Sequence, residues 1–451
     1  MNRRLPLFAA VAGLTLSTAL IAPTGASASP SPDAGEFEEA LQAAAKPLTT
    51  PFEDSDGATW TTFDEWLDFW SALDDSSDRV EVDQYATSGE GRPIHAITVG
   101  YPAPPSTRAQ ARGSVLLLNC SIHGNEPAGR EACMILARDM STTQDPRVLR
   151  FLSQTTVVMT NVNPDGWVHN VRGNAERIDV NRDFMTLETN EGQALISLVN
   201  QRRPDVMNDL HEYGPSRGHD WQATTLWPRN RNVDPGVQSM SRTMVREYVA
   251  PAITSRGLTH GTYGERVKDG EPYLRFVGDD QARILRNYTG LRHIVGQLTE
   301  SATRPTVAAE QDNPALLNRN RVAVQYASVI GNAEIIEAQR DRIAQTTAAA
   351  AERATRMGAA QEGVIYFAGQ DDMLPTQANQ VEPDPMCGYT ISTEDAQKWA
   401  RTLELHGITH KPSGDEVWVP MGQPARGLIP LLFDERSEHA ITEGTPHDEC
   451  R

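Results

Sequence analysis

Two potential metal ligands stand at the end of an apolar run in Leu116-Leu-Leu-Asn-Cys-Ser-Ile-His-Gly-Asn-Glu-Pro-Ala-Gly-Arg-Glu131. The apolar run from Val115 to Leu118 is typical of a buried strand, and Pro127 with the residues after it indicates a helix that has proline in its first turn. His123 and Glu126 therefore lie on the turn between strand and helix. One imidazole and one carboxylate are two of the three ligands of a catalytic zinc site of the His2Glu type. A third ligand must come from farther along the chain.

Polar residues follow other apolar runs in the same way. Asp205-Val-Met-Asn-Asp-Leu-His211 ends in a histidine, and His293-Ile-Val-Gly-Gln-Leu-Thr-Glu300 ends in a glutamate. A third run begins at Thr156 and breaks into Asn163-Pro-Asp-Gly166. Ligands of open α/β sheets bind outside the carboxyl ends of the strands, so these side chains can meet in one crevice. The pattern predicts an α/β fold with a single site at that edge.

In this order the motifs resemble the zinc metallocarboxypeptidases of the carboxypeptidase A type, the M14 family, over roughly residues 60–305. His123 and Glu126 look like the first ligand pair, His211 like the third ligand, and Glu300 like the general base. The resemblance implies a mixed, mostly parallel sheet flanked by helices. It also implies one Zn²⁺ per chain, which lowers the pKa of its bound water to about 7.

Three segments between the ligands are similar to the substrate-holding segments of that family: Asn163–Gly166, Arg172–Ala175 and Asp179–Arg182. The resemblance implies that Asn181 and Arg182 bind the terminal carboxylate of a substrate, because a guanidinium grips a carboxylate through paired hydrogen bonds. Arg172 would stabilise the oxyanion that forms when water attacks the scissile carbonyl. Simple ion pairs are the alternative for both arginines, since Glu176, Asp179 and Asp183 are close in sequence.

The family's substrate-capping tyrosine has no clear counterpart. Tyr273 is one candidate, whereas Tyr288 is very close to Glu300 in sequence. The residue at the bottom of the specificity pocket is expected between Gly270 and Arg286. That stretch contains Arg275, Asp279, Asp280 and Arg283, so basic, acidic and neutral preferences all remain open.

Two alternatives concern the metal ligands. His219 follows His211 by eight residues and could compete with it. A cysteine ligand is the second alternative, but His123, Glu126 and His211 form a complete set without one. The His-Glu-x-x-His helix of other metalloproteases is excluded, because no histidine stands four residues after His211.

The chain begins with Met1-Asn-Arg-Arg4, an apolar run from Leu5 to Ile21, and Ala26-Ser-Ala28, which together predict a secretory signal peptide over residues 1–28. We therefore expect a secreted protein cleaved near Ala28; a membrane anchor is the less favoured alternative. The formal charge is −19 for the whole chain and becomes −21 without this segment, because Arg3 and Arg4 are lost. Such acidity argues against nucleic acid or anionic membranes as partners.

The length of 451 residues exceeds what one core supports, so we expect two domains, a catalytic one and a smaller one. The composition predicts a loosely ordered leader at 29–58, a zinc peptidase domain at 59–321, a helical linker or strut at 322–358, and a small β-containing region at 359–451. An apolar stripe at helical spacing in the peptidase part is expected to be core: Phe63, Trp66, Leu67 and Trp70.

The four cysteines fit an oxidising compartment. Cys120 and Cys133 flank the predicted metal turn and could brace it, and Cys387 and Cys450 could staple the C-terminal region. Four cysteines allow three connectivities, and the sequence alone does not choose among them.

These features together predict a secreted zinc carboxypeptidase that acts on peptides or proteins with a free C-terminal carboxylate. Glu300 would take the proton from the attacking water and deliver it to the leaving amine. One alternative is a zinc amidohydrolase of the aspartoacylase type, which shares the His-Gly-Asn-Glu turn. Another is a non-catalytic peptide-binding homologue. The oligomeric state is not predicted.

Overall fold

The structure is a computed structural model, and it describes residues 36–42, 45–46, 48–106, 113–216, 219–268, 271–274, 280–369 and 377–450. For residues 265–268 and 271–274 only the backbone is described. The segment predicted as a signal peptide, residues 1–28, lies outside the described residues.

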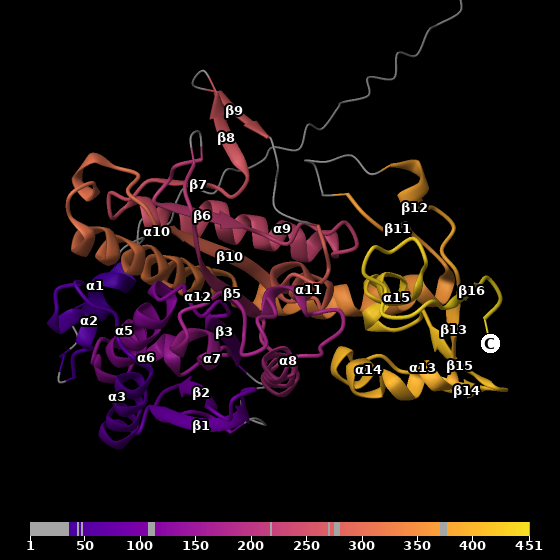
Figure 1. Cartoon of the computed structure of the whole chain (residues 1–451), viewed down its shortest axis with the longest axis horizontal. Coiled ribbons are helices and arrows are strands. Elements are labelled where there is room, and N and C mark those ends of the chain that lie inside the picture. Colours follow the sequence, from indigo (N-terminus) through magenta and orange to yellow (C-terminus); the bar gives the residue numbers. More distant parts are fainter. Residues whose placement is uncertain are drawn as a thin grey trace, which may run out of the picture.

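An eight-stranded mixed sheet forms the centre of the described structure, with strand order β1-β2-β4-β3-β5-β10-β6-β7 (Figure 1). The pairs β4–β3, β3–β5, β5–β10 and β6–β7 are parallel, and the others are antiparallel. The predicted mixed, mostly parallel sheet is therefore confirmed. Its strands are β1 Val80–Thr87, β2 Pro93–Val99, β3 Ser114–Ser121, β4 Thr155–Asn161, β5 Val206–Tyr213, β6 Ala223–Leu226, β7 His260–Thr262 and β10 Val295–Ala302.

Both faces of the sheet are covered, which explains why its central strands read as continuous apolar runs. Successive side chains of a strand point to opposite faces. In β3, Leu116 and Leu118 accordingly join one hydrophobic cluster, and Val115 and Leu117 join the other. All eight residues of β3 are buried.

The helices divide between these two clusters. One cluster contains residues of α3, α5, α6, α10 and the first half of α12, and the other contains residues of α8 and α11. The bounds of the helices around the sheet are α3 Phe63–Ser76, α5 Ala128–Thr142, α6 Pro146–Leu152, α7 Pro164–Val168, α8 Asn190–Arg202, α9 Pro235–Thr243, α10 Ala250–Thr254 and α11 Leu285–Leu291, with a π-helical turn at Met244–Val249 and short 3-10 turns at Val180–Arg182 and Ala308–Glu310. A hairpin, β8 Glu265–Lys268 and β9 Glu271–Leu274, stands apart from the main sheet (Figure 1).

Part of the predicted leader is well packed, which differs from the expectation of a loosely ordered segment. Helices α1 (Glu36–Gln42) and α2 (Pro51–Asp54) lie within residues 29–58. Phe37, Leu41 and Phe52 are buried, and the Phe37 ring meets that of Phe151 edge-on at 5.2 Å. The physical reason is that Phe37 and Leu41, four residues apart, share one helix face, and that face is covered by the first cluster.

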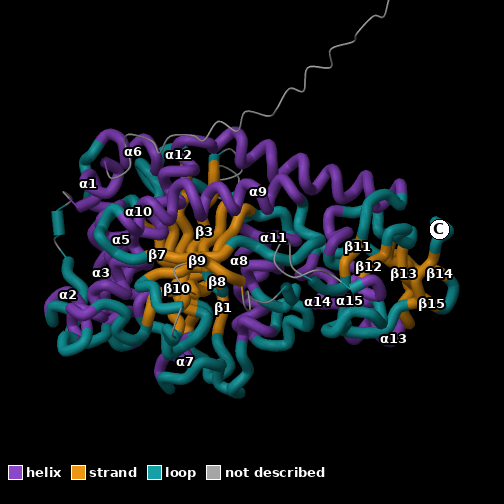
Figure 2. The backbone as a smooth tube through the Cα atoms, turned by 90° about the horizontal axis from the view of Figure 1, so that it is seen from above, coloured by secondary structure: helices purple, strands orange, loops and turns teal. Residues whose placement is uncertain are grey.

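The predicted helical strut is a single long helix, α12 (Pro314–Ala360), which runs from the sheet toward the C-terminal region (Figure 2). It begins before the expected boundary at residue 322, and its first half packs directly on the sheet. Asn332 Oδ1 accepts a hydrogen bond of 2.8 Å from Asn208 Nδ2 of β5. Gln339 departs from helical geometry and divides the helix into two parts. The first half of α12 thus belongs to the core of the peptidase part.

The C-terminal region contains the expected strands, and it shares a hydrophobic core with the central sheet. Its sheet has the order β14-β15-β13-β16, and Tyr389 and Phe433 belong to the same cluster as Leu117 of β3. Its elements are β11 Ile365–Tyr366, β12 Val381–Glu382, β13 Gly388–Ser392, α13 Thr393–Lys398, α14 Ala400–His406, β14 Lys411–Ser413, β15 Glu416–Pro420, α15 Ile429–Phe433 and β16 Thr445–His447, with 3-10 turns at Ala378–Gln380 and Pro424–Gly427. This region therefore completes the cover of the second face of the sheet.

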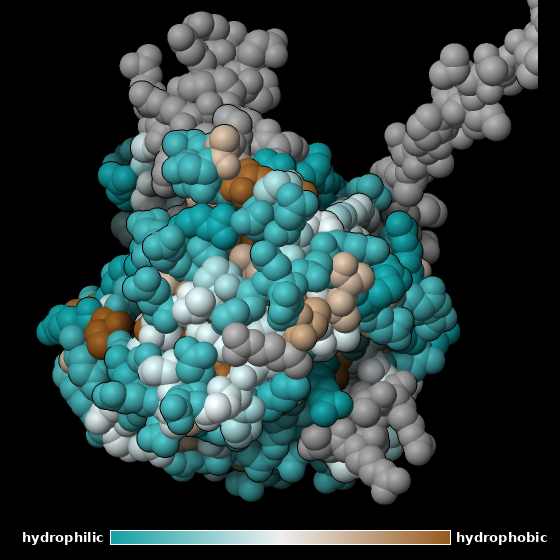
Figure 3. Space-filling model, turned by 90° about the vertical axis from the view of Figure 1, so that its right-hand side faces the viewer, coloured by the Kyte–Doolittle hydropathy of each residue, from teal (hydrophilic) through white to brown (hydrophobic). Residues whose placement is uncertain are grey.

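The cysteines form two disulfides, Cys120–Cys133 and Cys387–Cys450. Among the described helices, none combines the length and the apolar character that crossing a bilayer requires. On the face shown in Figure 3, apolar residues form small separate patches within a mainly hydrophilic surface.

Candidate active site

Three buried side chains bring their metal-ligating atoms together at the carboxyl ends of β3 and β5. Nδ1 of His123 lies 2.8 Å from Oε1 of Glu126 and 3.0 Å from Nδ1 of His211. Nδ1 of His211 lies 3.0 Å from Oε2 of Glu126. In the described part of the chain, these residues are the one group whose ligand atoms all lie within 4.8 Å of one another.

Each imidazole has a carboxylate next to its Nε2 atom, and this contact orients the Nδ1 atom on the opposite side of the ring toward Glu126. Oδ1 of Asp179 lies 3.1 Å from Nε2 of His123, and Oδ2 of Asp209 lies 2.7 Å from Nε2 of His211. A neutral imidazole that donates its Nε2–H to a carboxylate keeps the Nδ1 lone pair free. Both lone pairs then point toward Glu126, where a cation would bind.

This donor set fits zinc. Two imidazole nitrogens and a carboxylate are a common protein set for catalytic zinc, and they leave a position open on the side of the cavity. Two Nδ1 lone pairs 3.0 Å apart repel each other unless a cation or a proton lies between them. The geometry of His123, Glu126 and His211 therefore agrees with the ligand set expected from the sequence.

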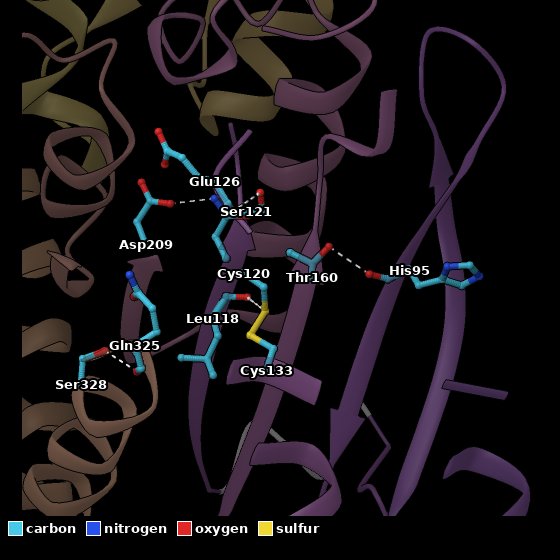
Figure 4. Close-up of a disulfide and its surroundings, with 11 residues drawn as sticks. His95, Leu118, Cys120, Ser121, Glu126, Cys133, Thr160, Asp209, Gln325 and Ser328 are labelled. Carbon is cyan, nitrogen blue, oxygen red and sulfur yellow. Dashed lines mark hydrogen bonds between the residues drawn. A yellow bond between two sulfur atoms is a disulfide. The ribbon is translucent and has the colours of Figure 1, made fainter. Parts of the chain in front are cut away.

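The turn that carries His123 and Glu126 is held from several sides. Ser121 Oγ donates to the carbonyl of His123 at 2.8 Å, and Arg130 Nη1 donates to the carbonyl of Gly124 at 3.1 Å. A Cβ at Gly124 would lie 1.8 Å from the backbone of Gly166, so only glycine fits there. Just before the turn, the disulfide Cys120–Cys133 ties β3 to α5 (Figure 4).

Glu300 lies next to His211, because the two residues are register partners in the parallel pair β10–β5. Glu300 is 7% exposed, and its Oε2 has no hydrogen-bond partner among the described residues. Burial raises the pKa of Glu300 to about 8, with the charge of His211 opposing this shift and that of Glu126 adding to it. A carboxyl group with a raised pKa and an unengaged oxygen is suited to proton transfer.

A cavity of about 500 Å³ opens in front of these residues, and it is lined by Arg172, the expected oxyanion-stabilising residue, and by Asn181 and Arg182, the expected carboxylate-binding residues. Arg172 lies beside the ligands, with Nη1 3.2 Å from Nδ1 of His123, and its Nε donates to Asp179 at 2.9 Å. Asn181 is buried, and its Oδ1 accepts a bond of 2.9 Å from the backbone N–H of Leu285. Arg182 is half-buried at the same wall.

Two tyrosines line this cavity. Tyr213 ends β5, and its hydroxyl donates to the carbonyl of Trp221. The other is Tyr263, which the sequence did not suggest. It lines the cavity on the turn between β7 and β8, and the charge of Glu300, together with burial, raises its pKa to about 12. Tyr288 is buried in the core, where its hydroxyl lies 2.9 Å from Nδ1 of His406, so it does not reach the cavity. Tyr273 lies in β9, and its side chain is outside the described structure. No motif marks Tyr263, because its position depends on the path of a long connection.

Ile284 and Arg286 are the described residues of the stretch 270–286 that line the cavity. Arg286 is 4% exposed, at the start of α11. The sequence predicts that the pocket residue lies in this stretch, but no pattern in it marks Arg286. Its burial against the cavity follows from the position of α11, which no local pattern gives.

His219, the alternative ligand, also lines the cavity but lies apart from the ligand group. Its ring packs edge-on against Tyr213 at 5.1 Å and against Tyr263 at 5.5 Å. The structure thus places His211, and not His219, with His123 and Glu126.

The known proteins that this chain resembles in sequence are described as carboxypeptidases. Residues 65–271 match the model of a family described as zinc carboxypeptidase. This range includes the three ligand residues and also Arg172, Asn181 and Arg182, but it ends before Glu300. Carboxypeptidase 2 of Trichophyton rubrum is 27% identical over 260 residues, which cover 55% of this chain and 48% of the relative. Carboxypeptidase E of Caenorhabditis elegans is 28% identical over 119 residues, 23% of this chain and 24% of the relative.

The chain spans about half the length of the Trichophyton relatives that it matches. Among solved structures, a putative carboxypeptidase A from Shewanella denitrificans is similar with a TM-score of 0.49 and 17% identity, over 62% of this chain and 70% of that one.

Proposed function

We propose that the chain is a secreted, zinc-dependent carboxypeptidase of the family whose model matches residues 65–271, and that it removes residues from the free C-terminus of peptides or proteins. The observation that carries the proposal is the arrangement of one buried ligand group, His123, Glu126 and His211, with Glu300 on the adjacent strand and arginines on the walls of the same cavity. One zinc ion per chain is expected, held by that ligand group.

A zinc ion held by His123, Glu126 and His211 would supply a Lewis acid for the scissile carbonyl and for an attacking water molecule. Glu300 accepts the proton of that water on a carboxylate oxygen. It then delivers the proton to the nitrogen of the leaving amine, as one group can do in both directions. The unengaged Oε2 of Glu300 supports this role, because a carboxylate whose oxygens were both in hydrogen bonds could not easily accept a proton.

Arg172 and Arg182 have different roles toward the substrate. Arg172 is next to His123, so its N–H groups can donate to the oxygen of the scissile carbonyl as negative charge develops there. Arg182 and Asn181 line the same cavity and can hold the terminal carboxylate of the substrate. Tyr263 faces the same space and is our candidate for the residue that closes over the substrate, in place of Tyr273.

The side-chain preference follows from Ile284 and Arg286. One is apolar and the other is positively charged, so a basic C-terminal residue would meet repulsion at this wall. We propose that apolar or acidic C-terminal residues are preferred over lysine and arginine.

Secretion is part of the proposal and rests on the predicted signal peptide and on the four cysteines, all of which form disulfides. An aspartoacylase-type amidohydrolase and a non-catalytic binding protein remain the alternatives.

The test is the release of C-terminal amino acids from N-blocked peptides by the purified protein, followed by mass spectrometry. Release should stop when a chelator is added and return with zinc. It should fall sharply on the same peptides with an amidated C-terminus, because Arg182 then loses its ionic partner. Equal rates on free and amidated peptides would exclude a carboxypeptidase. Turnover of N-acyl amino acids but not of blocked dipeptides would favour the amidohydrolase, and the absence of any chelator-sensitive turnover would favour the binding protein.

A further inference from the structure

A second cavity, of about 610 Å³, lies beside the metal turn. Its walls include the aromatic rings of Trp60, Phe63 and Trp167, and Val168 lies at its edge. We name it the aromatic cavity. Phe63 was expected to be core from its helical spacing, but it is only partly buried, and the remainder of its surface faces this cavity.

The aromatic wall is held firmly. The guanidinium of Arg130 stacks on the ring of Trp167 at 4.1 Å, and Phe63 and Trp66 meet the same ring edge-on at 5.4 and 5.8 Å. A ring fixed on three sides offers apolar surface without losing conformational freedom on binding. Val168 adds exposed apolar surface at the edge, since 45% of it is accessible.

Three charged side chains line this cavity: Arg92, Arg130, which is stacked on Trp167, and the exposed Asp64. Arg92 lines it, but Nη1 of Arg92 lies 2.7 Å from Oδ1 of Asp165 and also pairs with Glu90. A compensated cation and three aromatic rings favour an uncharged, apolar occupant.

Two chain segments connect the aromatic cavity with the catalytic cavity. Glu126 lines the catalytic cavity, and Pro127, the next residue, lines the aromatic cavity. Arg172 lines the first, and Asn170, two residues earlier, lines the second. Two residues span at most about 7 Å of extended chain. The two cavities are therefore neighbours across the residues that would meet the scissile bond.

The bound peptide of a carboxypeptidase can extend from the site only on the side of the scissile bond that is opposite its terminal carboxylate. With its terminal carboxylate at Asn181 and Arg182 and its scissile carbonyl near Arg172, every preceding residue must pass beyond the ligand turn. An extended peptide advances about 3.3 Å per residue. A few residues are enough to reach from the scissile bond into the aromatic cavity.

We propose that the aromatic cavity is a subsite for an apolar side chain of the substrate, about two to four residues N-terminal to the scissile bond. This inference rests on the proposed carboxypeptidase function and adds a preference for longer peptides with an apolar upstream residue. Placing an apolar side chain against these rings removes its surface from water, so it strengthens binding and lowers KM more than it changes kcat.

The experiment compares N-acetylated peptides that end in the same two residues. One is the dipeptide alone, and the others are hexapeptides with leucine or with serine at the third, fourth or fifth position from the C-terminus. We expect one leucine position to raise kcat/KM by about tenfold over serine, through KM; this corresponds to about 1.4 kcal/mol. The dipeptide should be cleaved at the lower rate.

Val168→Asp provides the matching variant, because an exposed residue can be changed without disturbing the core. It should remove the leucine preference on hexapeptides and leave the dipeptide rate unchanged. The control is Tyr101→Asp, which also replaces an exposed apolar residue, 37% accessible, by aspartate, at a position that lines neither cavity.

Equal rates for leucine and serine peptides at all three positions would overturn the subsite while leaving the carboxypeptidase function in place. The same conclusion would follow if Val168→Asp slowed dipeptide and hexapeptides equally, or if Tyr101→Asp had the same effect. If no peptide were cleaved, the proposed function would fail. The subsite would then be judged by tryptophan fluorescence, since Trp60 and Trp167 line it. No change on adding the leucine hexapeptide would overturn the subsite as well.

Discussion

Oδ2 of Asp209 lies 2.7 Å from Nε2 of His211, on the side of the imidazole that faces away from His123 and Glu126. Both residues are on β5, two positions apart, so their side chains share one face of the strand. The other oxygen of Asp209 accepts a hydrogen bond of 2.7 Å from Asn119 Nδ2 of β3. The carboxylate is thus fixed by two strands, and it fixes the orientation and the tautomer of His211.

The first prediction is that Asp209→Asn weakens zinc binding. An amide oxygen accepts the Nε2–H of His211 less strongly than a carboxylate does, so Nδ1 becomes a poorer ligand. Loss of such a partner typically costs about 10- to 100-fold in metal affinity. Competition with a chromogenic chelator measures the affinity directly. Asp83→Asn, at an exposed position on β1, is the control and should bind zinc like the wild type. Unchanged affinity in Asp209→Asn would mean that the orientation of His211 is set by other contacts.

The second prediction separates His211 from His219. The protein should bind about one zinc ion, and His123→Ala or His211→Ala should lose it, because two ligands rarely hold a catalytic zinc. His219→Ala should keep it, since the His219 ring lies between Tyr213 and Tyr263. Metal content after dialysis, measured by atomic absorption, shows which of the two histidines is the third ligand. Full occupancy in His211→Ala together with loss in His219→Ala would reverse the assignment.

The metal turn and the strand ends could be predicted from the sequence because each is a local pattern. An apolar run followed by His, Glu, Gly and Pro gives both a strand and its turn, as in β3 and the residues after it. Asp209 also has a local signal in the sequence. It stands two residues before His211 in a predicted strand, and this spacing alone puts both side chains on one face.

Other features depend on contacts between distant segments and could not be predicted in this way. Tyr263 and Arg286 reach the cavity through the paths of long connections. The packing of α1 has a local sign, because Phe37 and Leu41 stand at helical spacing. The alanine- and proline-rich composition around them nevertheless favours the prediction of a loosely ordered segment. The shared core of the C-terminal region and β3 has no sequence signature, because any apolar surface could cover that face of the sheet.

The third prediction concerns stability and pH. Glu131 of α5 is 2% exposed, and its two carboxylate oxygens accept hydrogen bonds from the backbone N–H and the hydroxyl of Thr61, at 2.8 and 2.9 Å. Burial raises the pKa of Glu131 to about 7, although both bonds to Thr61 act in the opposite direction. The unfolded chain has the ordinary value of 4.5. The protonated form therefore contributes stability that is fully present below pH 4.5 and is lost as the pH rises through about 7.

Glu131→Gln should remove this loss, because it carries no charge. Its amide oxygen can still accept from the backbone N–H of Thr61, and its amide nitrogen can donate to the Thr61 hydroxyl oxygen. Each pKa unit is worth about 1.4 kcal/mol, so the variant should gain on the order of 1 to 3 kcal/mol over the wild type at pH 8 and about nothing near pH 4.5. Denaturant unfolding at both pH values, with the exposed Glu81→Gln as the control, measures the difference. A gain of equal size at both pH values would show that Glu131 is not the titrating group.

The fourth prediction tests the proton transfer. Glu300→Gln keeps the size of the side chain and its carbonyl oxygen but cannot accept a proton at neutral pH. General acid–base catalysis is typically worth about 10²- to 10⁴-fold, so kcat should fall by at least that much when one residue serves both transfers. Zinc should stay bound, because His123, Glu126 and His211 are untouched. KM should change little, since substrate binding depends on Asn181 and Arg182. Steady-state kinetics with metal analysis on the same samples give all three readings. If kcat remained above about a tenth of the wild-type value, far short of the expected loss, or if zinc were lost with activity, Glu300 would not be the base.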